Sequence, residues 1–543
     1  MDIVAACKSL LHTYQLTPSN SSLSCSEDSR QNTSQVKTIY FSGLCIQRKM
    51  EINAQESLMS EFDMPSVMQV KRESKSRPIF AQAITATLVY LTAICNGLSS
   101  GYSAILLPQL RANNSGFELD EDIESWIVSI YIGATPVGCL LSGIMMDVWG
   151  RRPTVQIAVS FVCVGWILIA TSSTYPLMLV GRALGGFGKG ATTPAITFHL
   201  EEMADPRLRG TLSACILLMY SIGIMLISLI GTNMSWKIAA GLAAVIGFGD
   251  LVGYSLLHES PVWLVRNNHI NKANQVFSWL WGSGHPAEVE RDLQKLLKRI
   301  KDENTELAKQ INTNVAPYQK WKQYFKPQIY KPFIIVHVFN IIQIICGTNL
   351  FIFYAVDIIS GLNSDGSVDI NLTTILTSIV RVVFMVVSCI ILVWIGRRTV
   401  CISSGLGSGI AAILIGTVVR MQNVQAWIIV SLVLIYVAFN TYGYFVLPPS
   451  MIGEILPSKI RCVAGAYIFT MNDIGMFCAS KAFPSILNAT GIYGLFWIFG
   501  VSSLACSLFL YLMLPETKGR SLVQIEEYFL KPNVLWLTSN KAM

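Results

Sequence analysis

Residues 143–152 read Gly-Ile-Met-Met-Asp-Val-Trp-Gly-Arg-Arg, and they close a long apolar run. The final triplet Gly-Arg-Arg, at residues 150–152, returns at residues 396–398, again directly after an apolar run. A basic turn that recurs after two apolar segments predicts that the chain contains two copies of one unit.

Two further paired features follow these turns in the same order. A glutamate precedes an arginine by seven residues in each copy, and a glutamate lies close to a proline near the end of each copy. The pairs are Glu202 and Arg209 with Glu454 and Arg461, and Glu259 near Pro261 with Glu516 beside Pro515. A duplicated unit of this kind places a binding site between the two halves near the middle of the membrane, and it predicts alternating access by rocking of the halves.

The composition shows what kind of unit is repeated. Hydrophobic residues make up 52% of the 543 residues and charged residues only 13%, whereas a soluble domain carries about a quarter charged residues. Apolar runs close to the length that spans a bilayer, about twenty residues of helix, recur along the chain. Because backbone polar groups in a bilayer must be bonded within their own segment, these runs must be helical. The sequence predicts an all-α polytopic membrane protein, with 12 transmembrane helices in two six-helix bundles.

The apolar runs set the boundaries of the expected parts. Spans are predicted at 79–107, 124–146, 154–174, 176–199, 211–232 and 237–257, and at 331–357, 372–394, 399–419, 426–447, 462–484 and 491–513. The expected parts are a disordered cytoplasmic tail (1–78), an N-terminal bundle (79–257), a cytoplasmic helical linker (258–330), a C-terminal bundle (331–513) and a cytoplasmic tail (514–543). Val289, Leu293 and Ile300 recur at helical spacing, which predicts an amphipathic helix within the linker.

Charge and glycosylation sequons indicate the orientation. Arginines and lysines gather in the loops that are then cytoplasmic, and the Asn-x-Ser/Thr sequons at Asn113 and Asn371 fall in loops on the outer side. We expect a plasma-membrane protein with both termini in the cytoplasm and with glycans at these two asparagines. The net charge of +7 is modest, so no nucleic-acid partner is implied, and we expect a monomer in the lipid bilayer.

The 13 cysteines mostly lie singly in apolar spans without metal-ligand spacing, so they indicate helix packing rather than disulfides or a metal site.

Charged residues cluster at the cytoplasmic ends of the predicted helices in both halves. They are Asp147, Arg151, Arg152, Glu202, Arg209, Glu259, Arg397, Arg398, Glu454, Arg461 and Glu516. Carboxylates and arginines can form charge-assisted pairs. If these pairs bridge the halves, they latch the inner mouth shut while the outer mouth is open. The alternative is that they cap helices locally and set the topology.

The same motifs carry a family resemblance. Residues 143–152 match the Gly-x-x-x-Asp-Arg/Lys-x-Gly-Arg-Arg signature except at Val148, and residues 181–190, 202–210, 259–264 and 515–520 match further motifs in order. Over about residues 80–530 the chain therefore resembles the sugar porter family of the major facilitator superfamily. Residues 101–103 (Gly-Tyr-Ser) and 380–383 (Val-Arg-Val-Val) look most like insect facilitated trehalose transporters.

The resemblance implies a sugar site in the seventh span, where the family's Gln-Gln-x-Ser-Gly-x-Asn is here Gln343-Ile-Ile-Cys-Gly347-Thr-Asn349. Amide side chains offer donors and an acceptor that match neutral hydroxyl groups. Gln343 and Asn349 do not share a face of a regular helix, but a break at Gly347 could turn both inward. The further substrate-site candidates are Asn340, Asn472, Tyr354 and Arg381. The alternative for each amide is helix–helix contact inside the bundle.

Several expected contacts depart from the family pattern. The second glutamine is Ile344, the fifth-span glutamine is Leu217, the eighth-span asparagine is Arg381, and the tenth-span tryptophan is missing. Arg381 could bind a sugar hydroxyl, hold an anionic substrate, or pair with an acid such as Asp473.

Proton-coupled sugar porters that this chain resembles carry an aspartate at the position of Ser103. Since serine does not titrate usefully, the resemblance implies a uniporter, with Asp250 and Asp473 as acids that could substitute. We therefore expect facilitated diffusion of a sugar, trehalose or a hexose. The alternatives are a carrier of an organic anion or another small solute, and a nutrient sensor that does not transport. No enzymatic motif or cofactor site stands out.

Overall fold

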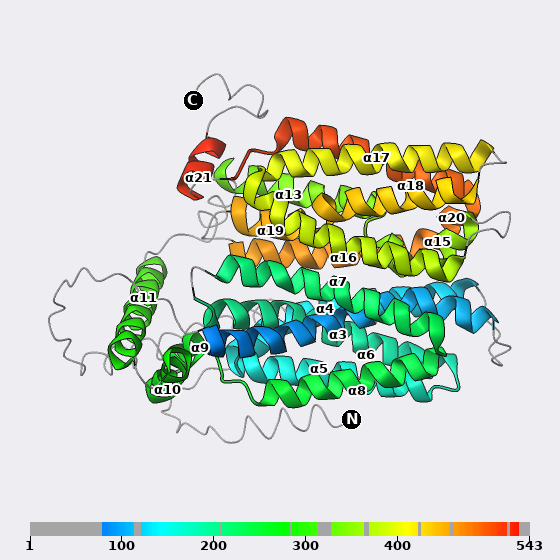
Figure 1. Ribbon diagram of the computed structural model, residues 1–543. Helices are drawn as coiled ribbons and strands as arrows, with labels where there is room; N and C mark the ends of the chain where they lie inside the picture. The colour runs from blue at the N-terminus through cyan, green and yellow to red at the C-terminus, as the bar shows by residue number, and fades with distance from the viewer. Residues whose placement is uncertain are drawn as a thin grey trace, which may run out of the picture. The chain divides into compact units, whose positions relative to one another are not determined.

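The computed structural model describes residues 79–112, 121–205, 208–282, 285–312, 327–362, 369–421, 425–456, 461–518 and 522–530. The predicted N-terminal tail, the sequon at Asn113 and the end of the C-terminal tail lie outside these ranges. Within them every regular element is a helix, as predicted (Figure 1).

The N-terminal half consists of α3 (Ile79–Ala112), α4 (Glu121–Val148), α5 (Arg151–Thr171), α6 (Tyr175–Met203), α7 (Arg209–Asn233) and α8 (Trp236–Ser255). Helix α6 packs along α4 and α5, and α7 packs along α3. Glycines allow this close contact: a Cβ atom at Gly186 would lie 1.9 Å from the Tyr131 carbonyl oxygen. The glycine-rich run in α6 is therefore a packing surface.

The C-terminal half consists of α13 (Pro327–Ile345), α14 (Leu350–Phe353), α15 (Ala355–Leu362), α16 (Ile370–Trp394), α17 (Arg397–Met421), α18 (Ala426–Phe439), the π-helix η1 (Asn440–Phe445), α19 (Leu447–Ile455) and α20 (Arg461–Met513). Gly491 has a φ of 67° inside α20 and divides it into two helices. Helix α21 (Leu522–Leu530) follows and packs against α13 and α19.

The described residues contain 10 helices long and apolar enough to cross a membrane. Helix α6, which carries Arg182 and Lys189 and is rich in glycine, is not among them, yet it lies packed within the same bundle. With α6 added, and with α20 counted as the two helices that meet at Gly491, the predicted number of twelve is reached.

The linker forms α9 (Pro261–Arg266), α10 (Ile270–Trp281) and α11 (Pro286–Asn312) at one end of the bundle, which we call the linker end (Figure 1). Val289, Leu293 and Ile300 on α11 are buried in one apolar cluster with residues of α9 and α10. The amphipathic helix predicted in the linker is confirmed.

Two predicted spans are interrupted rather than continuous. The span predicted at 331–357 breaks at Gly347, where φ is +78°, as the sequence suggested. The span predicted at 426–447 passes through η1 and continues to Ile455, and nothing in the sequence pattern indicated this π-helix. Both interruptions lie deep in the C-terminal half.

Replacing Gly347 with alanine should destabilise the protein. A left-handed backbone costs a residue with a Cβ atom about 1–2 kcal/mol, and that Cβ would lie 2.6 Å from Phe499 Cε2. We expect a clearly lower unfolding temperature in detergent for Gly347→Ala. Gly143→Ala is the matched control, because Gly143 is exposed on α4 with open space at its Cβ position. Equal unfolding temperatures for the two variants would contradict this account.

Candidate functional site

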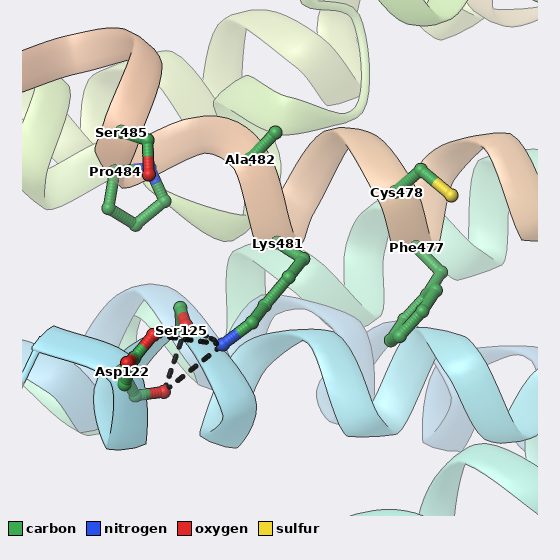
Figure 2. Close-up of a pocket in the computed structure, with 8 residues that line it drawn as sticks. All are labelled: Asp122, Ser125, Phe477, Cys478, Lys481, Ala482, Pro484 and Ser485. Carbon is green, nitrogen blue, oxygen red and sulfur yellow. Dashed lines mark hydrogen bonds and ion pairs between the residues drawn. The ribbon is translucent and has the colours of Figure 1, made fainter. Parts of the chain in front are cut away.

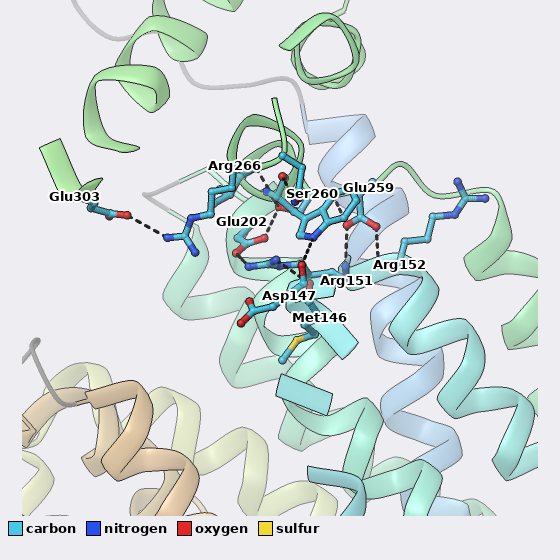
Figure 3. A network of polar contacts seen from close by, with 12 residues as sticks. Met146, Asp147, Arg151, Arg152, Glu202, Glu259, Ser260, Arg266 and Glu303 are labelled. Atoms are coloured by element: carbon cyan, nitrogen blue, oxygen red, sulfur yellow. Dashed lines mark hydrogen bonds and ion pairs between the residues drawn. The ribbon is translucent and has the colours of Figure 1, made fainter. Parts of the chain in front are cut away.

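The charged residues at the linker end of the N-terminal half form one network (Figure 3). The Glu259 carboxylate accepts hydrogen bonds from the backbone N–H groups of Arg151 at 2.9 Å and Arg152 at 3.1 Å, so it caps the start of α5. The Arg151 guanidinium donates to Glu202 Oε1 at 2.9 Å, and Ser260 Oγ donates to Glu202 Oε2. Burial raises the pKa of the Glu259 carboxyl, and the N–H groups that it accepts lower it in part.

The C-terminal half repeats this network contact for contact. The Glu516 carboxylate accepts from the backbone N–H groups of Arg397 at 3.0 Å and Arg398 at 3.3 Å, at the start of α17. Arg397 Nε donates to Glu454 Oε1 at 3.2 Å, and Thr517 Oγ1 donates to Glu454 Oε2 at 2.6 Å. The repeat that was inferred from sequence is therefore also a repeat of geometry.

Both networks stay within their own half in this structure, so a latch that joins the halves in another state stays a prediction. Local capping, the alternative interpretation, accounts for the contacts. Asp147 contributes its backbone oxygen, which accepts from Trp263 Nε1 at 3.0 Å. Arg209 begins α7, and its Nε is buried without a hydrogen-bond partner among the described residues. Arg461 begins α20, and its side chain lies outside the description.

The two halves are joined by polar contacts at the opposite end, which we call the far end. Arg111 on α3 pairs with Asp357 on α15 at 2.6 Å. Lys481 on α20 lies 3.5 Å from Asp122 Oδ1 on α4 and donates to Ser125 Oγ (Figure 2). Its ammonium group also lies over the Trp126 ring. A pocket of about 460 Å³ lies beside this contact, lined by residues of both α4 and α20. The far end is the side on which the halves are held together.

The two helix interruptions brace each other. Gln343 Nε2 on α13 donates to the Tyr444 carbonyl oxygen in η1 at 2.8 Å. The Tyr436 hydroxyl on α18 donates to the Cys346 carbonyl oxygen, next to Gly347, at 2.7 Å. Each side chain therefore satisfies a backbone carbonyl beside the other interruption.

The remaining predicted amides differ in their availability. Asn340 Nδ2 donates to the Val336 carbonyl of its own helix at 2.8 Å, so its amide group is partly occupied. Asn349 is half-buried beyond the Gly347 break, and its side chain forms no hydrogen bond with a described residue. Asn472 Oδ1 on α20 is buried without a partner among the described residues.

Tyr354 is committed to packing. Its hydroxyl donates to the Ser480 carbonyl at 2.9 Å, and its ring stacks on Phe483 with the centroids 4.1 Å apart. The predicted ligand role for Tyr354 is not supported by this geometry, because the ring closes α14 against α20 and the hydroxyl proton is already used.

Sequence reasoning missed Asn440, the first residue of η1. Its side chain is 4% exposed, and neither amide atom forms a well-aligned hydrogen bond with a described residue, although the amide interacts with the Tyr436 hydroxyl. Thr348, next to the Gly347 break, is also buried with its hydroxyl unpaired. Buried amides are normally satisfied, and π-helical turns gather at functional sites. The only available signal was an asparagine inside an otherwise apolar span.

The charges between the halves divide into a coupled pair and a lone arginine. Lys189 on α6 interacts electrostatically with Asp473 on α20, and Asp473 also bonds Thr135. Arg381 on α16 is 5% exposed and lies with Cζ 5.8 Å from the centre of the Phe445 ring. The suggested pairing of Arg381 with Asp473 does not occur among the described contacts.

The N-terminal half contains a buried arginine and a buried acid that do not meet. Arg182 donates to Ser103 Oγ and to the Ser99 carbonyl, so the serine faces a cation directly. Asp250 accepts from Thr92 on α3 at 3.0 Å, and its other oxygen is buried without a partner among the described residues. Of Asp250 and Asp473, the two acids that the sequence suggested as substitutes, Asp473 therefore lies between the halves and Asp250 lies within one of them.

Comparison with known proteins gives a consistent result. The sequence model of the family described as sugar (and other) transporter matches residues 79–529. The facilitated trehalose transporter Tret1 of Apis mellifera ligustica is 29% identical over 458 residues, which cover 83% of this chain and 88% of that protein. The Tret1 protein of Aedes aegypti is 28% identical over 481 residues, but the match spans only 58% of its length.

Among solved structures, the inward open conformation of the xylose transporter XylE from E. coli has a TM-score of 0.66. It is 18% identical and covers 82% of this chain and 98% of that chain. This likeness confirms the predicted major facilitator fold.

The capping glutamates should stabilise both halves to a similar degree. Loss of a helix N-cap costs about 0.5–2 kcal/mol, so we expect Glu259→Ala and Glu516→Ala each to lower the unfolding temperature in detergent. Glu303→Ala is the control, because Glu303 pairs with Arg266 on the exposed surface of the linker, where an ion pair contributes about 0–1 kcal/mol. If removing either cap had no more effect than the control, the capping role would be wrong.

Proposed function

Because this chain belongs to the sugar (and other) transporter family, we propose that it moves a sugar, trehalose or a hexose, across a membrane by facilitated diffusion. Members of the family are transporters, so a carrier and not an enzyme is the class to which the chain is assigned. The relatives named facilitated trehalose transporters support trehalose as the first substrate to test.

The observation that carries this proposal is the group of amides around the two helix interruptions that lack well-aligned protein partners. The Asn349 side chain forms no hydrogen bond with a described residue, that of Asn440 forms no well-aligned one, and Gln343 donates to the Tyr444 carbonyl in η1. A sugar supplies both donors and acceptors on neighbouring hydroxyl groups, so it can satisfy amides that no protein group satisfies. Tyr220 and Phe445, whose ring centroids lie 6.2 Å apart, bring α7 and η1 together beside these groups.

Alternating access follows from the two duplicated halves, for which we take 79–257 and 331–513 as the moving bodies. The far-end contacts of Arg111 with Asp357 and of Lys481 with Asp122 hold one mouth closed. In the opposite state these contacts part, and the linker-end charges come close enough to pair across the halves as a latch. The same residues then cap helices in one state and also join the halves in the other.

A uniport mechanism is supported by the pairing of Ser103 with Arg182. Coupling to protons requires a carboxylate that loads and releases a proton along the transport path, and this position carries a hydroxyl instead. Asp473 already interacts with Lys189, so a change in its charge is opposed by a neighbouring cation. Flux should therefore follow the sugar gradient alone.

The surroundings of the carrier are proposed from the charge pattern. We take the linker end as cytoplasmic and the far end as outer, in a plasma membrane and as a monomer. Asn371 is exposed at the first turn of α16, at the far end, where a glycan could be attached. Asn113 belongs to the same outer side by sequence.

Counterflow of labelled trehalose in liposomes tests the proposal. Purified protein loaded with unlabelled trehalose should accumulate the label transiently, and a protonophore should not change this. Gln343→Ala should lower flux at least tenfold, since it leaves the Tyr444 carbonyl unpaired and removes a sugar contact, and Asn349→Ala should act similarly. Gln294→Ala on the linker helix α11 removes an amide that bonds only Glu290, and flux should persist.

The outcomes separate the alternatives. Trehalose binding without any flux of trehalose or hexose favours the nutrient sensor over a carrier. Full flux in both amide variants would remove the proposed site, and collapse of uptake by the protonophore would remove the uniport mechanism.

A further inference from the structure

Arg381 is the most unusual group near the candidate site. Its side chain is 5% exposed in the middle of α16, yet it forms no hydrogen bond or ion pair with any residue that the structure describes. Its nearest characterised neighbours are the Phe445 ring and the phenols of Tyr220 and Tyr436, all of which are uncharged groups. A buried cation thus lies beside η1 without a counter-ion among the described residues.

The other central charges do not neutralise it. Asp473 on α20 lies between the halves, but it interacts with Lys189. Asp250 is bonded to Thr92 inside the N-terminal half. The three central ionisable groups, Lys189, Asp473 and Arg381, therefore leave one positive charge uncompensated, and that charge belongs to Arg381.

An isolated cation at membrane depth costs several kcal/mol unless water or a partner compensates it. Sugar hydroxyls accept hydrogen bonds from a guanidinium but leave its charge in place. A carboxylate or phosphate accepts hydrogen bonds from the guanidinium and also neutralises its charge. Two of its oxygens match the planar fork of the guanidinium, and they carry the opposite charge. Burial makes this difference larger than it is in water.

A polar side chain of η1 fits the rest of such a ligand. Asn440 begins η1 one turn beyond Tyr436, and its amide forms no well-aligned hydrogen bond with a described residue, the Tyr436 hydroxyl being the group with which it interacts. Phe445, which lies against Arg381, is the last residue of the same π-helix. An amide on η1 thus lies on the same short element as the ring that faces the Arg381 cation of α16, an arrangement that suits a hydroxylated ring with one acidic substituent.

We propose that the site prefers sugars that carry an anionic oxygen group, and that Arg381 is the residue that pairs with this group. This inference rests on the proposed sugar-carrier function and narrows its substrate class. A hexuronate or a hexose phosphate should then be favoured over the neutral hexose of the same ring.

The experiment compares counterflow of labelled glucuronate, glucose 6-phosphate and glucose in the same liposomes, with trehalose as the reference substrate. The protein should prefer at least one of the two anions over glucose, and the two anion arms identify whether carboxylate or phosphate is recognised. Arg381→Gln should lower the ratio of anion flux to glucose flux about tenfold or more, as expected for a lost charged hydrogen bond. Arg381→Lys should keep part of that ratio.

Arg420→Gln is the matched control, because Arg420 is an exposed arginine at the end of α17, over the Trp497 ring. It should leave the ratio unaltered. Competition of each unlabelled anion against trehalose counterflow in the unmodified protein gives a readout that needs no variant.

Two results would overturn the inference while leaving the carrier intact: trehalose counterflow that neither anion inhibits, or an unchanged flux ratio in Arg381→Gln. Absence of flux and of binding for every sugar, neutral or anionic, would instead remove the proposed function itself.

Discussion

The hydrogen bonding of the backbone within the membrane constrains everything else in this fold. Each spanning segment must pair its own N–H and C=O groups, so an interruption is tolerated only where another group takes over. Gln343 does this for the Tyr444 carbonyl, and Tyr436 does it for the Cys346 carbonyl. Polar side chains of the C-terminal half therefore lie at the two interruptions of its helices. The residues that bond the freed backbone carbonyls also mark the place at which we propose that a polar solute binds.

The sequence was sufficient for the fold and for one of these interruptions. The apolar runs predicted the twelve helices because their length and lack of charge leave no other structure in a bilayer, and Gly347 was identified because only glycine readily adopts a positive φ. The π-helix Asn440–Phe445 carried no comparable signal, since it contains no proline and its glycine, Gly443, does not have a positive φ. Its position depends on packing against α16 and α17, which a single sequence does not reveal.

The candidate site was only partly predictable for a related reason. An amide in a span can face a ligand, a neighbouring helix or its own backbone, and Asn340 turned out to bond its own helix. Tyr354 was assigned by resemblance, but its ring is held by Phe483. The charged residues at the helix ends form networks, but the sequence alone did not show that their partners in this structure lie within the same half. The residue types thus indicated which segments contain candidate polar groups. The contacts in the folded chain decided which of these groups are already hydrogen-bonded by the protein.

The two capping networks help to show which half of the molecule each peripheral helix is attached to. Glu259 and Ser260, which begin the linker, are bonded to α5 and α6, and the apolar cluster of the linker includes Ala81 and Met203. Helix α21, in contrast, buries Ile525 and Phe529 in the core of the C-terminal half. In the proposed rocking motion, the linker helices would therefore move with the first half and α21 with the second. The distance between α11 and α21 would then change with the angle between the two halves, so it would report that angle from a position at the linker end of the bundle.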